Sequence, residues 1–215
     1  MTARQMLREL RAHANPRHVA GMARFSINPT GTLGVPIPVL RALASKIGRD
    51  HVLARQLWAT GIHEARILAA FIGEPAQLTS RQMDGWARDF DSWDVCDQVC
   101  GNLFDKTPVA YRKAVAWSRR REEFVKRAGY VLMASLAVHD KEAGDAAFEK
   151  FLPHIVRGAT DDRNFVKKAV NWALRQIGKR NPLLRRQAIR TARQIQSTNS
   201  PSTRWIAADA LRELS

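Results

Sequence analysis

The chain has 215 residues, enough for one domain or one repeat array with a sizeable hydrophobic core. Apolar residues make up 45% and charged residues 26%, as in ordinary globular proteins, and the apolar runs are too short for a transmembrane helix. Lys and Arg number 35 against 20 Asp and Glu, which leaves a net charge of +15. Such an excess favours a polyanionic partner, most often nucleic acid, over a membrane surface or an acidic protein. The first residues, MTARQMLREL, lack the apolar core of a signal peptide, so we expect a cytoplasmic, bacterial nucleoid-associated protein.

Apolar residues recur with helical spacing throughout the chain, and Pro, Gly and good N-cap residues divide it into segments. No stretch combines a strand pattern with turn chemistry, so we predict an all-α protein. A Gly- and Pro-rich loop is expected over residues 26–38 (SINPTGTLGVPIP). The predicted helices cover residues 2–14, 16–25, 37–48, 50–60, 63–73, 79–89, 93–104, 108–118, 122–138, 141–151, 163–179, 182–196 and 201–213.

Short helices with short connections suit antiparallel pairs that stack side by side. We therefore predict an α-α superhelix of HEAT-like repeats, with a concave surface, as a single domain over residues 1–215. The sequence shows no clean repeat period when it is laid against itself, so this prediction depends on helix length, on helix number and on the family resemblance described below.

The helix predicted over residues 93–104 carries the first candidate site. Trp93, Cys100 and Phe104 share one of its faces, with the carboxylate of Asp97 among them. A carboxylate on so apolar a helix is costly unless a cation or a ligand accompanies it. The alternative is an exposed or salt-bridged Asp on an ordinary amphipathic helix.

The sequence offers little support for metal or nucleotide chemistry. Cys96 and Cys100 lie four residues apart on one helix, a poor geometry for a disulfide, and we expect both to be small core residues. The pair His63 and Glu64 lacks a second His at metal-ligand spacing, and no GxGxxG or GK[ST] loop occurs. We therefore expect no metal and no cofactor.

Cations stand out in two later segments. In the helix predicted over 122–138, Arg127 borders the apolar stripe, where it can pair with a buried carboxylate, reach a phosphate or simply extend to water. Residues 163–193 contain ten Lys and Arg and no acidic residue, whereas solvated faces normally mix charges of both signs. This segment therefore favours polyanion binding. Its cations are Arg163, Lys167, Lys168, Arg175, Lys179, Arg180, Arg185, Arg186, Arg190 and Arg193.

The helix predicted over 163–179 separates its polar and apolar residues. Lys168, Asn171, Arg175 and Lys179 form a polar stripe with spacings of three and four residues. Trp172 lies between this stripe and the apolar one, where an aromatic ring can face a groove.

Three segments together resemble the AlkD family of alkylpurine DNA glycosylases: residues 92–97 (SWDVCD), 124–128 (FVKRA) and 164–175 (NFVKKAVNWALR). Shorter stretches add to the likeness, namely GVP at 34–36, LR at 40–41, LW at 57–58 and HEAR at 63–66. The resemblance covers residues 30–195, and its most specific part is the order and spacing of the three segments.

The resemblance implies a HEAT-like solenoid whose concave basic face binds duplex DNA. It also implies a monofunctional base excision repair enzyme that hydrolyses the N-glycosidic bond of N3-alkyladenine or N7-alkylguanine without cutting the strand. Trp93, Asp97 and Trp172 match the active-site Trp-Asp-Trp of the family, and Arg127 matches its active-site arginine. We expect a monomer, with DNA contacts from Lys126, Lys167, Lys168, Arg175, Lys179, Arg180, Arg185 and Arg186.

Two other functional classes are open. A non-catalytic DNA-binding solenoid would keep the basic face but would not need Trp93, Asp97 and Trp172 together. A helical scaffold for an acidic protein would keep its partner in the presence of competing DNA and would not depend on Asp97.

Overall fold

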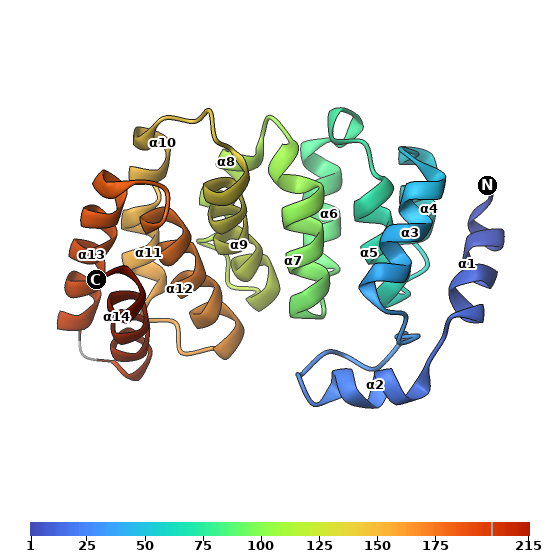
Figure 1. The fold of residues 1–215 in the computed structure, drawn as a ribbon, viewed down its shortest axis with the longest axis horizontal. Helices are drawn as coiled ribbons and strands as arrows, with labels where there is room; N and C mark the ends of the chain where they lie inside the picture. Colours follow the sequence, from blue (N-terminus) through green and yellow to red (C-terminus); the bar gives the residue numbers. More distant parts are fainter. Residues whose placement is uncertain (199) are drawn as a thin grey trace. The chain divides into compact units, whose positions relative to one another are not determined.

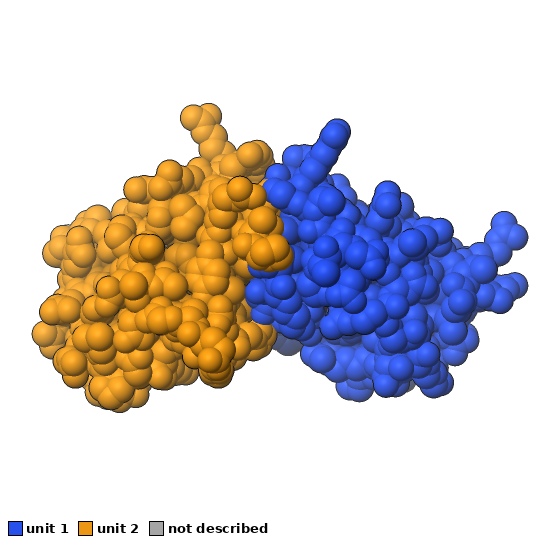
Figure 2. All heavy atoms as spheres, turned by 90° about the horizontal axis from the view of Figure 1, so that it is seen from above, with its two compact units in different colours: residues 1–107 blue, residues 108–215 orange. Residues whose placement is uncertain are grey.

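The computed structural model describes residues 1–198 and 200–215, and these form helices and connecting turns without any strand (Figure 1). The chain divides into two compact units, Met1–Thr107 and Pro108–Ser215, called unit 1 and unit 2 below (Figure 2). The all-α prediction is confirmed, whereas the single domain over residues 1–215 stays a prediction. Within the described residues, no helix is both long and apolar enough to cross a membrane.

Unit 1 is built around α5, which packs against α3, α4 and α7. On the side of α4, the ring of Trp58 stacks on Trp86 of α6, with centroids 4.1 Å apart. Phe90 and Phe104 extend this aromatic cluster towards α7. The helices of unit 1 are α1 (Ala3–Ala12), α2 (Pro16–Ala23), α3 (Ile37–Ile47), α4 (His51–Trp58), α5 (His63–Ile72), α6 (Ser80–Arg88) and α7 (Trp93–Asn102), with 3-10 turns η1 (Pro75–Gln77) and η2 (Phe104–Lys106).

Unit 2 is built around α9, which packs mainly against α8 and α12. Gly129 lets α9 approach the end of α8, because a Cβ there would lie 2.4 Å from the backbone nitrogen of Ser118. α12 in turn packs against α11, α13 and α14. The helices of unit 2 are α8 (Ala110–Trp117), α9 (Glu123–His139), α10 (Asp145–Glu149), α11 (Leu152–Gly158), α12 (Asn164–Gly178), α13 (Pro182–Ser197) and α14 (Pro201–Leu214).

Capping residues explain why most helices begin where the sequence predicts. Asp50, Thr79 and Asn181 each accept a hydrogen bond from the backbone of the first turn that follows them. Proline occupies one of the first positions of α2, α13 and α14, where its missing N–H has no helical partner to lose. All but one of the predicted helices match the observed ones to within two residues at each end.

The exception is the helix predicted over 141–151, which is wrong. Residues 145–149 form the short helix α10, and residues 152–158, which carry no predicted helix, form α11. Pro153 explains the break, because it has no N–H to donate to Glu149 and is well tolerated only in the first turn of a new helix.

Candidate functional site

The exposed end of α7 carries the two candidate catalytic residues of unit 1. Ser92 is the N-cap of α7, Trp93 is its first residue, and Asp97 follows one turn later. Both candidate side chains are half-buried, whereas Cys100 and Phe104, at the other end of the same predicted face, are fully buried. The face therefore runs from the surface at Trp93 into the core of unit 1.

The two cysteines are buried free thiols, as predicted. Burial raises the pKa of the Cys100 thiol well above its ordinary value, and the neighbouring Cys96 and Asp97 raise it further. Cys100 is therefore a protonated core residue at neutral pH and not a thiolate nucleophile.

Trp93 is held by the loop that connects α2 to α3. Its indole Nε1 donates to the carbonyl oxygen of Phe25 at 2.9 Å, while Asn28 Nδ2 donates to Asp91 Oδ2 at the same distance. Ser26, between them, has a φ of 58°, the left-handed region that a residue with a side chain rarely adopts. The loop thus fixes the indole plane and leaves the Phe25 side chain 71% exposed beside it.

A buried ion pair ties the first turn of α7 to α5. The Nε2 atom of His63 lies 2.8 Å from Oδ2 of Asp94, and the other carboxylate oxygen, Oδ1, accepts a hydrogen bond from the Ser92 hydroxyl. Burial by itself would lower the pKa of His63, but the hydrogen bond and charge of Asp94 outweigh it and raise that pKa. Burial would likewise raise the pKa of Asp94, and its bond to His63 lowers it instead. The pair is therefore charged at mildly acidic pH.

The neighbouring Glu64 holds the other end of the loop. Its completely buried carboxylate accepts the backbone N–H groups of Leu33, Gly34 and Val35 at 2.8, 2.6 and 3.2 Å. Gly34 adopts a φ of +78°, and a Cβ there would lie 2.3 Å from the carbonyl oxygen of Asn15. This part of the loop predicted over residues 26–38 is therefore a fixed support for α5 and α7.

Three cations of unit 1 line a cavity of about 340 Å³ between α3, α5 and η2. Arg41 lies over the ring of Phe71, with 4.9 Å between its guanidinium carbon and the ring centroid. Arg49 donates to the carbonyl oxygen of Gly73 at 2.6 Å, and Lys106 completes the group. The DNA contacts predicted from the sequence do not include these three cations, because the three lie far apart along the chain.

In unit 2, Arg127 is buried within the α9–α12 contact. It is 6% exposed, and its Nη1 donates to the carbonyl oxygen of Phe165 at 2.6 Å. The rings of Phe165 and Phe124 lie beside this contact, with centroids 5.4 Å apart. Arg127 therefore joins two helices of unit 2. Trp172 is half-buried on α12, at the border position that its spacing predicts.

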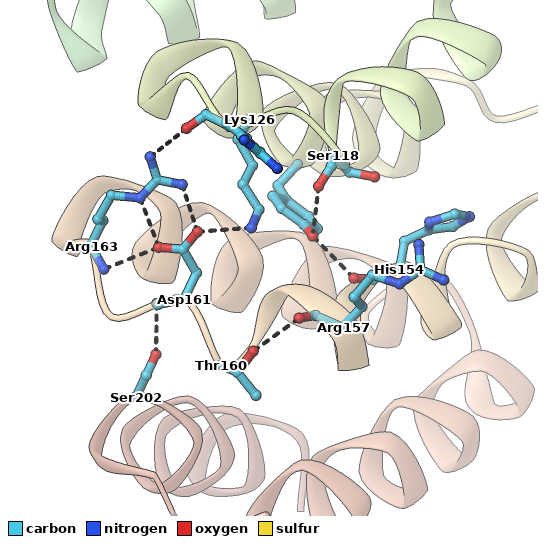
Figure 3. A network of polar contacts seen from close by, with 10 residues as sticks. Ser118, Lys126, His154, Arg157, Thr160, Asp161, Arg163 and Ser202 are labelled. Atoms are coloured by element: carbon cyan, nitrogen blue, oxygen red, sulfur yellow. Dashed lines mark hydrogen bonds and ion pairs between the residues drawn. The ribbon is translucent and has the colours of Figure 1, made fainter.

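Lys126, the neighbour of Arg127, lies in a polar network centred on Asp161 (Figure 3). Arg163 donates from Nε and Nη2 to the two carboxylate oxygens of Asp161 at 2.9 and 2.7 Å, and Lys126 Nζ donates at 2.8 Å. Burial would raise the pKa of Asp161, but the bonds from Arg163 and Lys126 outweigh it and lower that pKa strongly. The network fixes the start of α12 against α9.

The polar stripe of α12 faces carboxylates of α14. Asn171 Nδ2 donates to Asp209 Oδ2 at 2.6 Å, Arg175 forms ion pairs with Asp209 and Glu213, and Lys179 pairs with Glu213. Residues 163–193 contain no acid, so the neutralising charges come from a helix that lies outside the segment. DNA binding by Arg175 and Lys179 stays a prediction.

The remaining residues predicted to contact DNA form two groups, one with contacts inside the protein and one that is exposed. Arg180 donates to the carbonyl oxygens of Ala137, Asp140 and Ala143 and therefore caps the end of α9. Lys167 lies over the ring of Trp205, with its Nζ 5.2 Å from the centroid. The others are exposed cations on α12 and α13, namely Lys168, Arg185 and Arg186.

The structure places Trp93 and Asp97 one turn apart in unit 1, and Arg127 and Trp172 in the α9–α12 pair of unit 2. Sequence reasoning misses the exposed Phe25 beside Trp93 and the Asp161 network. No local pattern marks Phe25, since only the fold brings its carbonyl to Trp93.

Three comparisons place the chain among known proteins. The model of a family described as DNA alkylation repair enzyme matches residues 6–214. A search of curated proteins gives no significant match. A solved structure is similar with a TM-score of 0.78 and 21% identity, over 90% of this chain and 83% of that chain.

That structure is of a protein described as one of "a new family of proteins related to the HEAT-like repeat DNA glycosylases with affinity for branched DNA structures". The likeness confirms the predicted HEAT-like repeat fold. Because the family model spans nearly the whole sequence, the chain belongs to the DNA alkylation repair enzyme family.

Proposed function

We propose that this protein is a DNA glycosylase that hydrolyses the N-glycosidic bond of positively charged alkylpurines in duplex DNA. The observation that carries the proposal is the half-buried carboxylate of Asp97, one helical turn from the half-buried ring of Trp93, in a member of a DNA alkylation repair family. Phosphate binding alone requires neither a carboxylate nor a fixed indole at this position.

The proposed chemistry suits one carboxylate. Loss of a base passes through a transition state that resembles an oxocarbenium ion, as in glycoside hydrolysis. An alkylated purine already carries positive charge and can leave without a general acid. Asp97 stabilises the positive charge that develops on the sugar and orients the attacking water. The water oxygen forms the new bond to C1′ and loses a proton to the solvent, and the purine departs with the electrons of the glycosidic bond.

The aromatic residues have a separate role in this proposal. Trp93, and Trp172 from unit 2, offer π faces to a cationic base or sugar, each worth about 0.5–2 kcal/mol. The bond from Trp93 to Phe25 supports the role of Trp93 because it fixes the orientation of the ring before DNA binds. Arg127 is buried and donates to Phe165, and this supports a role in holding the α9–α12 pair near a bound phosphate.

We assign DNA binding to the exposed cations, of which Lys168 is the strongest candidate. They contact phosphates without reading the base sequence. The cavity of Arg41, Arg49 and Lys106 is a further candidate for backbone contact in unit 1. We propose that these two groups, and not the whole net charge, determine the salt dependence of binding.

The test is release of free base from duplex DNA that contains N7-methylguanine or N3-methyladenine. We expect release by the wild type and a loss of about a hundredfold or more in Asp97→Asn. Glu142→Gln is the matched control, since it removes an exposed carboxylate just before α10 in unit 2. Equal release by wild type and Asp97→Asn would refute the proposed role of Asp97.

A second candidate function is DNA binding without catalysis. Its support is the similar solved structure, whose protein is described as having affinity for branched DNA. Measured affinity for a four-way junction and for a duplex of equal length separates the two candidates. Tighter binding of the junction, together with no base release from either methylated substrate, would favour this second function.

A further inference from the structure

Unit 2 contains an apolar groove that the proposed function does not use. A cavity of about 580 Å³ lies between α8 and the α10–α11 segment. Its apolar floor is formed by Val115, Ala116, Ala147 and Phe151. The ring of Tyr111 stacks on Phe151, with centroids 5.7 Å apart and planes 15° from parallel, and forms a flat wall. The volume is in the range that accommodates a large side chain or a small ligand.

The rim of this groove is cationic. Arg112 of α8, Arg119 just after α8 and Lys150 just after α10 line the cavity and are exposed. None of the residues that line the groove is acidic. Within the described part of the chain, these three cations form no ion pair, in contrast to Arg175 and Lys179. The positive charge of the rim is therefore not neutralised from within unit 2.

Two carboxylates of the same region, Asp140 and Glu149, accept hydrogen bonds from other residues and do not neutralise the positive charge of the rim. Asp140 accepts a hydrogen bond from the hydroxyl of Tyr111 at 2.9 Å, and Glu149 accepts one from Gln187 at 2.6 Å. The positive charge also affects His154 of α11. Burial lowers the pKa of its imidazole, and the charges of Arg119 and Arg157 lower that pKa further.

We infer that this groove binds an acidic peptide segment of a partner protein, with one large apolar side chain in the cavity and carboxylates on Arg112, Arg119 and Lys150. Charge complementarity selects the acidic segment, since guanidinium groups bind carboxylates through paired hydrogen bonds. The apolar floor favours a peptide over duplex DNA, because the bases of a duplex are stacked within it and its phosphate backbone has nothing to place in an apolar cavity. Lys168 and Trp172, candidates for DNA contact, lie on α12, which does not line the groove, so the inference is independent of the proposed glycosylase activity.

The test is fluorescence anisotropy with a fluorescein-labelled peptide, Asp-Asp-Leu-Phe-Asp-Asp, and the full chain. Binding is expected for this peptide and at least tenfold weaker binding for Asp-Asp-Ala-Ala-Asp-Asp, which keeps the charge but lacks the apolar anchor. The double variant Arg119→Ala/Lys150→Ala should weaken binding at least tenfold. The matched control, Arg190→Ala/Arg193→Ala, removes two exposed cations of α13 and should leave the affinity unchanged.

A second variant keeps the test independent of charge. Ala116 is exposed on α8 at the edge of the floor, so Ala116→Trp fills the groove and should also weaken binding at least tenfold. Equal binding of both peptides, or equal binding by the control and groove variants, would overturn the inference. So would the absence of binding to wild type at 1 mM peptide, about the weakest affinity that counts as specific. Competitive displacement of the peptide by an undamaged duplex would assign the groove to nucleic acid and would also overturn it.

Discussion

The Nε2 atom of His63 lies 2.8 Å from Oδ2 of Asp94, so the first residue of α5 is joined to the first turn of the helix that carries Asp97. The His63 side chain is 4% exposed and that of Asp94 16%, which removes most of the screening by water. Glu64 and Asp91 add their negative charges to that of Asp94 around the imidazole. The pair is therefore a structural support of the candidate site.

We predict that His63→Gln destabilises the protein in a pH-dependent way. The folded pKa of Asp94 lies below 3.8 and that of His63 above 6.5, so the ion pair contributes fully between these values. Its contribution is lost as the pH falls through the folded pKa of Asp94 or rises through that of His63. Thermal unfolding of wild type and variant from pH 3 to 9 should show the largest difference, about 1–3 kcal/mol, near pH 5. A difference that does not vary with pH would contradict a charged pair.

Glu64→Gln should loosen the loop over residues 33–35. A carboxamide places an NH₂ group where three backbone N–H donors converge, so at least one donor loses its acceptor. We expect a loss of about 1–3 kcal/mol in the free energy of unfolding. Hydrogen exchange should become faster at the amides of Leu33, Gly34 and Val35. Unchanged exchange there would show that Glu64 does not hold the loop.

Trp93→Phe separates the aromatic face from its hydrogen bond. The phenyl ring keeps a π face on the first residue of α7 but cannot donate to the carbonyl oxygen of Phe25. On the proposed function, kcat for base release should fall up to about tenfold, because a lost bond of about 0.5–1.5 kcal/mol leaves the ring less well oriented. Single-turnover kinetics on methylated duplex DNA measure this, and a wild-type rate would mean that the bond does not matter for activity.

Glu213→Gln tests whether Arg175 and Lys179 can contact DNA. The change removes the carboxylate that pairs with both cations. If they face the DNA, affinity should rise and the salt dependence of binding should become steeper, by up to about 0.9 in the slope for each phosphate gained. Glu142→Gln, an exposed change of the same charge before α10, is the control. Identical slopes in the two variants would remove Lys179, whose ion-pair partner is Glu213, from the predicted DNA contacts.

Lys168→Ala and Arg185→Ala distinguish two faces of unit 2. Both side chains are exposed, but Lys168 belongs to α12, with Trp172, whereas Arg185 belongs to α13. On the proposed function both side chains contact phosphates, so each variant should lower the salt slope by about 0.9. Titration of a labelled duplex at several salt concentrations provides both slopes. A slope that falls in only one variant would limit the DNA contact to the helix of that residue.

The sequence predicts the helices well because their boundaries depend on local chemistry. Asn181 followed by Pro182 marks the start of α13 without reference to any distant residue. The break at Pro153 is also local, and the prediction fails there because α10 is too short to show a helical period. The buried cysteines follow in the same way from the apolar surroundings of α7.

The candidate site is less accessible to sequence reasoning, because its partners come from distant segments. Lys179 is a surface cation by sequence, yet its carboxylate partner Glu213 lies 34 residues later. The indole of Trp93 depends on Phe25, 68 residues earlier. Residue type and spacing identify Trp93 and Asp97 as candidates, but only the fold reveals what holds the indole and which cations are already neutralised.

The clamp that the Glu64 carboxylate forms on the backbone N–H groups of residues 33–35 has an evolutionary consequence. A carboxylate that recognises peptide amides is indifferent to the side chains attached to them, so the loop is specified by its backbone. Gly34 and Glu64 should therefore be retained among related sequences. Leu33 contributes only its backbone amide to the clamp, so its side chain should vary. The loop beside the candidate site can in this way diversify without loss of the support beneath α7.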